Sequence, residues 1–350
     1  MVFRVYRANL PLKTPIQTAN GECSTRPTIA VSITFDDTCF WGEIPAFLDA
    51  SYMSETHDIC WSWIIQHAPD ILTAFMTDTP WHMGAAALDF PICASGLDQL
   101  WTQIQAAKHP MGMGAFLGIA HSVPIYGAAM IGIQHNIVAY ESQIQRAHQM
   151  GYTHIKLKCT PSTLPLILTL LHDQGRGAAL ENISVDANGS FDASNWDTLK
   201  QLPSDILIEQ PVSPDQTELL HHIIDHFPHR VLLDESIRSV HDIHAFKDCP
   251  VGLMLKPVCL GGIQVTLHAL KLAKTYGRPC GISGYLDGGI GRYFHWLLAQ
   301  HPLITLRPDF VWSNYYYHQD ICSIMPDTVT LNHLPMVRSE RFFESRSFKY

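Results

Sequence analysis

The sequence lacks several features that would place the protein in a membrane or on nucleic acid. No run of about 18 uninterrupted apolar residues occurs, so we expect no spanning helix. Lysines and arginines form no cluster, and a net charge of −9 disfavours a surface for nucleic acid or anionic lipid. The opening MVFRVYRANLPLKTP meets Arg7, Pro11 and Lys13 before a signal-peptide core could form. We therefore interpret this segment as a strand and not as an export signal.

The nine cysteines form no framework, because their number is odd and no CxxC pair occurs. In a chain of 350 residues this usage is typical of reduced, mostly buried thiols, and we expect a cytoplasmic protein. The 20 histidines are numerous, but no HExxH or similar ligand pattern joins them. A histidine-rich metal store is therefore a minor hypothesis, and surface helix positions are the expected place of these residues.

The middle of the chain, residues 123–310, alternates short β-branched runs with amphipathic stretches long enough for one helix each. The strand candidates are VPIYGAA from Val123, THIKLK from Thr153, NISVD from Asn182, DILIE from Asp205, RVLLDE from Arg230, VGLMLK from Val251, RPCGIS from Arg278 and LITL from Leu303. Strands that alternate with helices indicate a parallel sheet. Eight such units predict a (β/α)₈ TIM barrel, and a doubly wound open sheet is the alternative.

The ends of the chain follow another pattern. Residues 1–120 begin with two strand-like runs, FRVYRANLPL and PTIAVSITFDD, and continue with helical segments around 55–75 and 82–107. We expect an α+β capping domain here and the barrel at residues 121–320. The tail, residues 321–350, contains the run DTVTLNHL, which we expect to form a short strand that packs back on the cap.

The most informative feature is the ionisable residue that closes each central strand candidate. These residues are Lys156 and Lys158, then Asp186, Glu209, Asp234 and Lys256. Their separations are 186−158 = 28, 209−186 = 23, 234−209 = 25 and 256−234 = 22 residues, each about one strand and one helix. In a barrel this spacing brings all six to the mouth where active sites lie. Strand-end charges are common singly, but six in consecutive units favour a site.

The residue types suit one kind of chemistry. Three carboxylates from adjacent strands predict a site for a hard divalent cation, Mg²⁺ with Mn²⁺ as the alternative. Lys156 and Lys158 point to the same face because they are two apart on a strand. A cation on a substrate carboxylate stabilises the charge that develops when the neighbouring carbon loses a proton, and a neutral lysine can take that proton. We therefore expect a small carboxylate as substrate.

At these positions the sequence resembles a known family. The runs KLK, VDANGSF, IEQPV, LLDESI and LKPVCLGGI resemble the enolase superfamily in its muconate-lactonizing subgroup. The similarity is greatest to o-succinylbenzoate synthases and N-succinylamino acid racemases. It covers nearly the whole chain, because LPLKTPIQTANGE resembles their mobile substrate loop, and WGEIPAF, YMSET and SNYYYHQDI also match.

The resemblance implies a role for each strand-end residue. Asp186, Glu209 and Asp234 would bind Mg²⁺. Lys158 would be the base on one face of the substrate, Lys256 would stand on the opposite face, and Lys156 would tune Lys158. Asn188 and Glu235 would hold the metal ligands or the lysines. A local turn role is the alternative for Asn188.

The same residues allow two reactions. A racemase needs acid and base on both faces, whereas a synthase that eliminates water needs Lys158 alone, with Lys256 as a cation. Racemases of this group carry an arginine three residues after the last lysine, and here that position is Cys259. We therefore expect o-succinylbenzoate synthesis, a dehydration in menaquinone synthesis. The alternatives are an N-acylamino acid racemase, a dipeptide epimerase and, more remotely, an inactive barrel that acts as a binding protein.

Two further segments are candidates for substrate contact. In GYLDGGIGRY, Asp287 stands where related sequences have glutamate, and Ser283 and Gly284 precede it. Glycines 288, 289 and 291 open a helix whose free N–H groups could hold a carboxylate, and a tight turn is the alternative. The early loop could close over the substrate through four polar side chains: Lys13, Thr14, Gln17 and Thr18.

Overall fold

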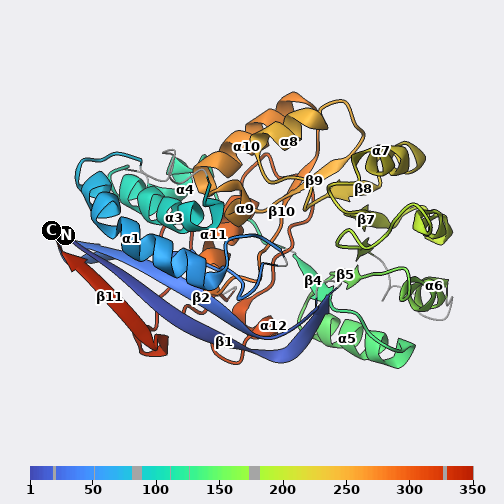
Figure 1. Cartoon of the computed structure of the whole chain (residues 1–350), viewed down its shortest axis with the longest axis horizontal. Helices are drawn as coiled ribbons and strands as arrows, with labels where there is room; N and C mark the ends of the chain where they lie inside the picture. Colours follow the sequence, from blue (N-terminus) through green and yellow to red (C-terminus); the bar gives the residue numbers. More distant parts are fainter. Residues whose placement is uncertain are drawn as a thin grey trace.

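The chain forms two sheets of different kinds, which lie in separate parts of the molecule (Figure 1). The computed structural model describes residues 1–18, 21–50, 52–80, 89–110, 112–125, 127–172, 182–325 and 329–349, without the side chains of residues 17, 18 and 21. One sheet has four antiparallel strands in the order β11-β1-β2-β3. The other has seven parallel strands, β4 to β10, in sequence order. The fold prediction, a TIM-like barrel with an α+β cap, is confirmed.

The cap sheet is built from two long strands and two shorter ones. Its strands are β1 (Val2–Thr18), β2 (Gly21–Phe35), β3 (Thr38–Ile44) and β11 (Glu344–Lys349). Alternate side chains such as Phe3, Val5 and Val31 are fully buried on one face. They pack with the apolar faces of two helices, α1 (His57–Met76) and α3 (Pro91–Ala107). Because alternate residues of a strand point to opposite faces, these apolar side chains form one face of the sheet, and that face packs against the cap helices. Helix α4 (Gly112–Phe116) follows α3.

The tail joins the cap at a different place from the one predicted. The expected strand DTVTLNHL is wrong for its described part, residues 329–334, which contains no strand. These residues instead pack as a coil: Tyr293 Oη donates to Thr330 O at 3.0 Å, and Gly114 N donates to Asn332 Oδ1 at 3.2 Å. Strand β11 comes later and pairs antiparallel with β1, from Val2 opposite Lys349 to Arg7 opposite Glu344. The two chain ends consequently lie together (Figure 1).

The barrel strands are short and almost wholly buried, which suits parallel strands covered on both faces. They are β4 (Ala128–Ile131), β5 (His154–Lys158), β6 (Ile183–Asp186), β7 (Leu207–Glu209), β8 (Val231–Leu233), β9 (Gly252–Leu255) and β10 (Cys280–Ile282). The connecting helices are α5 (Ile137–Gln149), α6 (Leu164–His172), α7 (Thr217–His226), α8 (Val240–Ala245), α9 (Pro257–Leu260), α10 (Ile263–Thr275), α11 (Gly289–Ala299) and α12 (Ser313–Tyr316), with 3₁₀ turns η3 (Trp196–Gln201) and η4 (Ser339–Arg341).

The eighth position of the barrel is filled by an irregular extended segment. The expected strand LITL is wrong, because residues 303–306 form no strand. The residues that follow close the ring: Asp309 N donates to Ile282 O at 2.8 Å, and Ala128 N donates to Pro308 O at 3.0 Å. Pro308 has no N–H to donate, which interrupts regular pairing. We call residues 306–310 the closing segment.

The first barrel strand also begins later than expected. We predicted it from Val123, whereas β4 starts at Ala128. The preceding residue, Gly127, lies so close to the closing segment that a Cβ there would be 2.0 Å from Phe310 O. A glycine is therefore required where β4 enters the barrel and the ring closes.

Candidate active site at the barrel mouth

The carboxyl ends of β5, β6 and β7 bring three predicted residues to one level. In the parallel register, Lys158 stands opposite Asp186, and Asp186 stands opposite Glu209. Adjacent parallel strands place such partners side by side. The residues that are regularly spaced in the sequence therefore form a row of charged groups at one edge of the barrel.

Three carboxylates converge at this edge. Single oxygen atoms of Asp186, Glu209 and Asp234 all lie within 4.8 Å of one another. The residues are 0%, 1% and 3% exposed, and the buried Asp234 Oδ1 has no hydrogen-bond partner among the residues that the structure describes. A set of oxygen-only ligands with an orphaned carboxylate oxygen fits a hard divalent cation such as Mg²⁺.

The two lysines of β5 enter the same cluster. Lys158 Nζ donates to Asp186 Oδ2 at 2.6 Å and to Asn188 Oδ1 at 2.7 Å. Lys156 Nζ donates to Glu209 Oε1 at 2.7 Å and also contacts Asp186 Oδ2 at 3.3 Å. Both ammonium groups are buried and paired with carboxylates. The structure therefore brings the lysine pair against the acids, as the spacing predicted.

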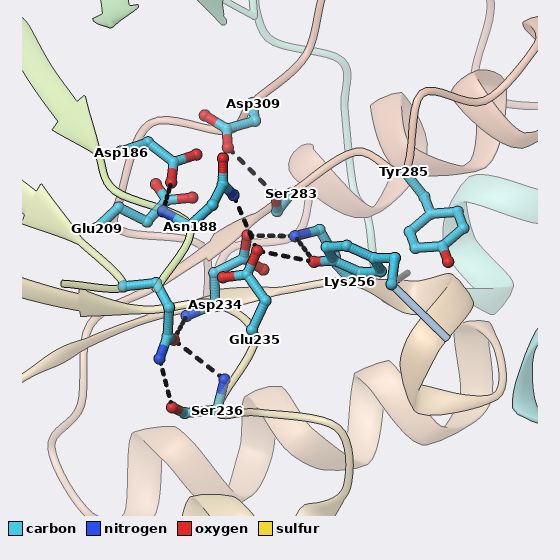
Figure 2. A network of polar contacts seen from close by, with 12 residues as sticks. Asp186, Asn188, Glu209, Asp234, Glu235, Ser236, Lys256, Ser283, Tyr285 and Asp309 are labelled. Carbon is cyan, nitrogen blue, oxygen red and sulfur yellow. Dashed lines mark hydrogen bonds and ion pairs between the residues drawn. The ribbon is translucent and has the colours of Figure 1, made fainter. Parts of the chain in front are cut away.

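Lys256 approaches from the other side of the barrel. With the closing segment as eighth position, β5 and the end of β9 lie 9−5 = 4 positions apart and so face each other across the ring. Lys256 Nζ contacts Asp234 Oδ2 (Figure 2). It also donates to Tyr52 Oη at 2.6 Å. Burial would lower the pKa of Lys256, but Asp234 and Glu235 outweigh it and raise that pKa above its usual value.

Asn188 and Glu235 connect the two sides. Asn188 Nδ2 donates to Glu235 Oε1 at 2.9 Å (Figure 2). Its Oδ1 accepts from Lys158 Nζ at 2.7 Å. Tyr52 Oη donates to the same Glu235 oxygen at 3.2 Å. A continuous chain of hydrogen bonds thus runs from Lys158 through Asn188, Glu235 and Tyr52 to Lys256. Asn188 also has the turn geometry that we considered, with φ +44°.

The buried charges shift one another's pKa. Burial, reinforced by the Glu235 carboxylate, raises the pKa of Asp234 to about 6. Burial acts in the same direction on Asp186, but the Lys158 ammonium outweighs it and holds the pKa of Asp186 below its usual value. Burial alone would lower the pKa of Lys156, yet the carboxylates that face it raise that pKa well above the usual range. The acids and lysines therefore compensate one another in a site that is almost wholly buried.

Sequence reasoning missed three residues of this network. Tyr52 lies in the loop before α1, Gln210 follows Glu209, and Asp309 lies in the closing segment. Gln210 Oε1 accepts from Asp234 N and from Ser236 N, both at 3.1 Å, and so fixes the turn after β8. The run IEQPV contained Gln210, but an amide beside a strand-end acid is a weak signal by itself.

Asp309 was missed because the eighth strand was placed too early. Its carboxylate contacts Lys156 Nζ, and Ser283 Oγ donates to its Oδ2 at 3.2 Å (Figure 2). The run LRPDF contains this acid, but no regular strand precedes it, so the pattern of strand-end charges did not mark its position.

A cavity of about 420 Å³ opens beside these groups. Its walls include apolar side chains from the cap, such as Phe47 and Leu48, and from the barrel, such as Tyr285 and Phe310. Lys156, Lys158, Asp186, Asn188, Asp234, Lys256 and Asp309 also line it. The cavity thus pairs a charged inner end with apolar walls, as expected for a small organic acid.

The residues that we predicted with less support as substrate contacts fall into two groups, those that line the cavity and those that do not. Ser283, Gly284 and Asp287 line the cavity. Lys13 and Thr14 do not line it: Lys13 Nζ donates to Asn314 O at 2.6 Å, and Thr14 Oγ1 accepts from Arg146 at 3.5 Å. The side chains of two more candidates lie outside the described residues: Gln17 and Thr18. Other residues of the same hairpin line the cavity: Ile16, Glu22, Cys23, Ser24, Thr25 and Pro27.

The N-terminus of α11 does not offer the free N–H groups that we predicted. Gly288 N and Gly291 N donate to the Glu43 carboxylate at 2.7 and 2.8 Å, and Gly289 N donates to Asp320 Oδ1 at 2.8 Å. Protein carboxylates therefore occupy the positive end of this helix, and the prediction of a substrate site there is wrong. The contacts instead fasten β3 of the cap to the barrel.

A second group of potential metal ligands has a structural explanation. Glu55, Cys60 and Cys93 are buried with their ligand atoms within 4.8 Å of one another. The Glu55 carboxylate, however, accepts from Ile92 N at 3.0 Å and from Cys93 N at 3.3 Å, at the start of α3. The positive end of a helix disfavours a cation. Within the described ranges, neither group of three or more ligands includes a histidine, so no histidine-built metal site is found there.

Comparisons with known proteins agree on one family. Residues 139–333 match the profile of the family described as enolase C-terminal domain-like. An o-succinylbenzoate synthase of Enterococcus faecalis is 26% identical over 343 residues, which cover 90% of this chain and 87% of that protein. An N-succinylamino acid racemase of Thermus thermophilus is 29% identical over 210 residues, covering 58% and 55% of the two chains.

Solved structures support the same fold. An enolase-superfamily member from Listeria innocua has a TM-score of 0.83 at 19% identity, with 99% of this chain and 98% of that chain covered. A dipeptide epimerase of Methylococcus capsulatus, solved with Mg and a dipeptide, has a TM-score of 0.80 at 19% identity and 92% coverage of both chains. In the part of the chain that the structure describes, no helix is both long and apolar enough to cross a bilayer.

Proposed function

The chain belongs to the enolase C-terminal domain-like family, part of the enolase superfamily, and on this premise we propose that it is a magnesium-dependent dehydratase that forms o-succinylbenzoate. Curated relatives with that name, from Enterococcus faecalis and Bacillus subtilis, cover about nine tenths of this chain at 26% and 24% identity. The observation that carries the proposal is the convergence of three buried acids with lysines on both sides of one cavity. The reaction would serve menaquinone synthesis in the cytoplasm.

The acids would hold the metal ion. Asp186, Glu209 and Asp234 provide buried carboxylate oxygens alone, and Asp234 Oδ1 accepts no hydrogen bond from the described residues. This donor set fits Mg²⁺. When bound, the ion would stabilise the negative charge that grows on the substrate carboxylate as the adjacent carbon loses its proton.

Lys158 is the base in this proposal. Its Nζ reaches the cavity and is oriented by Asn188 Oδ1 at 2.7 Å, an amide oxygen that remains available when the acids engage a cation. The α-proton of the substrate moves to Lys158 Nζ, and the electrons of the C–H bond pass toward the carboxylate. The C–O bond to the leaving hydroxyl then breaks, and Lys158 returns the proton so that water departs.

Lys256 acts as a fixed cation on the opposite face. Its Nζ contacts Asp234 and donates to Tyr52, whose hydroxyl donates in turn to Glu235, so the ammonium group is held between a carboxylate and a hydroxyl. A lysine held in this charged form stabilises negative charge and is a poor base. Together with Cys259 in place of an arginine, this supports the dehydratase over the racemase.

Racemisation of N-succinylamino acids is the second candidate, because lysines on both faces are what that reaction requires and because the Thermus thermophilus relative bears that name. The direct test is to incubate the purified protein with the cyclohexadiene carboxylate precursor and Mg²⁺ and to follow aromatisation by ultraviolet absorbance. We expect turnover that EDTA abolishes. Racemisation of an N-succinylamino acid, or epimerisation of a dipeptide, without aromatisation would overturn the proposal.

A matched pair of variants tests the roles of the lysines. Lys158→Ala should abolish aromatisation and exchange of the α-proton with deuterium from solvent. Lys256→Arg keeps a positive charge and should retain part of the dehydration, whereas a racemase would lose inversion in either variant. Complete loss in Lys256→Arg, with the fold intact by circular dichroism, would contradict the role of Lys256 as a cation.

A further inference from the structure

Lys156 contacts two of the carboxylates that would hold the metal ion. Its Nζ lies 2.7 Å from Glu209 Oε1 and 3.3 Å from Asp186 Oδ2. An ammonium group and Mg²⁺ are attracted by the same oxygens, so binding of the ion must weaken these contacts. Lys156 is only 4% exposed and cannot carry its charge into solvent instead. It therefore needs a partner that the ion does not take.

Asp309 occupies the position of such a partner. Its Oδ2 contacts Lys156 Nζ directly. Among the described residues, the group of mutually close carboxylate oxygens comprises Asp186, Glu209 and Asp234 and does not include Asp309. Asp309 thus touches the lysine from outside the set of expected metal ligands.

The closing segment holds Asp309 in place by its backbone and its side chain. Asp309 N donates to Ile282 O at 2.8 Å, and its backbone forms a parallel bridge with Ser283. Ser283 Oγ donates to Asp309 Oδ2 at 3.2 Å (Figure 2), and Ser283 N donates to Leu255 O at 2.8 Å. Asp309 is therefore anchored to β10 by its backbone and, through Ser283, to β9.

We propose that Asp309 is a positioning residue that holds Lys156 as its counterion and so releases Asp186 and Glu209 to bind the metal ion. This inference rests on the proposed function, because it assumes a divalent cation at the three acids. Without Asp309, Lys156 would compete with the ion for Asp186 and Glu209, and its uncompensated charge would repel the ion. The barrel closure thereby contributes to the affinity of the site for metal without supplying a ligand.

The test is the affinity for Mg²⁺ alone, measured by titration calorimetry on the full chain without substrate. Asp309→Asn should raise the Kd for Mg²⁺ roughly tenfold, and Lys156→Met should lower it. In the Lys156→Met background, Asp309→Asn should change the Kd several times less than it does in the wild type. Asp49→Asn removes the same charge from an acid that lines the cavity but is not an ion-pair partner of Lys156, and should leave the Kd within about twofold.

The outcomes separate the two proposals. Equal effects of Asp309→Asn in both backgrounds would mean that Asp309 acts on the ion by its charge alone, and would overturn the positioning role. A wild-type protein that binds no Mg²⁺ would overturn the proposed function itself. If Asp309→Asn does not fold, Ser283→Ala provides the same test, because losing the Ser283 hydrogen bond should raise the Kd in the same direction only when Lys156 is present.

Discussion

Tyr52 of the cap and Lys256 of the barrel are joined by a hydrogen bond of 2.6 Å, in which Lys256 Nζ donates to Tyr52 Oη. Tyr52 precedes α1, and Lys256 follows β9, so two parts of the fold meet at one ammonium group. The Tyr52 hydroxyl also donates to Glu235. The cap therefore does more than cover the cavity, because one of its side chains orients a charged group of the barrel.

Tyr52→Phe removes this hydrogen bond and keeps the aromatic ring. We expect kcat/KM for aromatisation to fall roughly tenfold, because Lys256 and Glu235 lose their shared partner in a buried site. Tyr285→Phe is the matched control, since Tyr285 packs edge-on against Tyr52 and its buried hydroxyl has no hydrogen-bond partner in the described part of the chain. A similar loss of activity in both variants would assign the effect to packing.

Asn188 combines a strained backbone with a bridging side chain, and two substitutions can separate these features. Its φ of +44° suits glycine, whereas an alanine there is strained by about 1 kcal/mol. Asn188→Gly and Asn188→Ala both lose the hydrogen bonds to Lys158 and Glu235, so both should lower kcat/KM by roughly 10–100-fold. Both variants should lose stability in urea unfolding because the buried partners are left unpaired, and Asn188→Ala should lose more than Asn188→Gly because of the added strain. Near-wild-type activity of Asn188→Gly would show that only the turn matters.

The strand-end residues could be predicted because each interrupts an apolar run at a regular spacing. The placement of Lys158, Asp186 and Glu209 side by side then follows from the parallel register, which depends only on neighbouring strands. Tyr52 and Asp309 could not be predicted in the same way. Tyr52 comes from a loop whose path depends on how the cap packs, and Asp309 lies in a segment that closes the ring without forming a regular strand.

The fold shows the same division between local and tertiary information. The alternation of strands and helices predicted the barrel, with an open sheet as the alternative, and the two strand-like runs followed by helical segments predicted the cap. The place where the tail returns to the cap could not be predicted. The run DTVTLNHL has strand-like composition, yet its described part is a coil that packs against α4 and α11. Tertiary hydrogen bonds to Thr330 and Asn332 outweigh the local preference there. The helix N-terminus at Gly288 failed as a predicted substrate site for a similar reason, since Glu43 reaches it from the cap.

Metal binding should stabilise the folded protein. Mg²⁺ at 100 times its Kd would add about 2.7 kcal/mol to the free energy of unfolding if it binds only the folded state. We therefore expect added Mg²⁺ to raise the melting temperature and EDTA to reverse the rise. Asp234→Asn should remove the response, because it removes the carboxylate whose Oδ1 lacks a partner. A response to Mg²⁺ that survives in Asp234→Asn would place the ion elsewhere.

Glu55 should make the stability of the cap depend on pH, independently of the metal site. Burial raises the pKa of Glu55 to about 7, against a usual value of 4.5, although hydrogen bonds from Ile92 and Cys93 oppose the shift. Between these values the folded state holds a proton that the unfolded state has released. The contribution of Glu55 to the free energy of unfolding is therefore fully present below pH 4.5. As the pH rises from 4.5 toward 7, the free energy of unfolding falls by up to about 1.4 kcal/mol for each pH unit.

Glu55→Gln keeps an oxygen that can accept from the start of α3 and removes the titration. Urea unfolding at pH 5 and pH 8 should show a smaller difference in midpoint for the variant than for the wild type. Glu43, whose pKa burial also raises to about 7, and Asp234, whose pKa burial raises to about 6, titrate in the same window and contribute to the difference that remains. An unchanged difference between the two pH values in Glu55→Gln would mean that Glu55 is ionised in the folded protein at pH 5. The hydrogen bonds from the α3 N-terminus would then outweigh the cost of burying its charge.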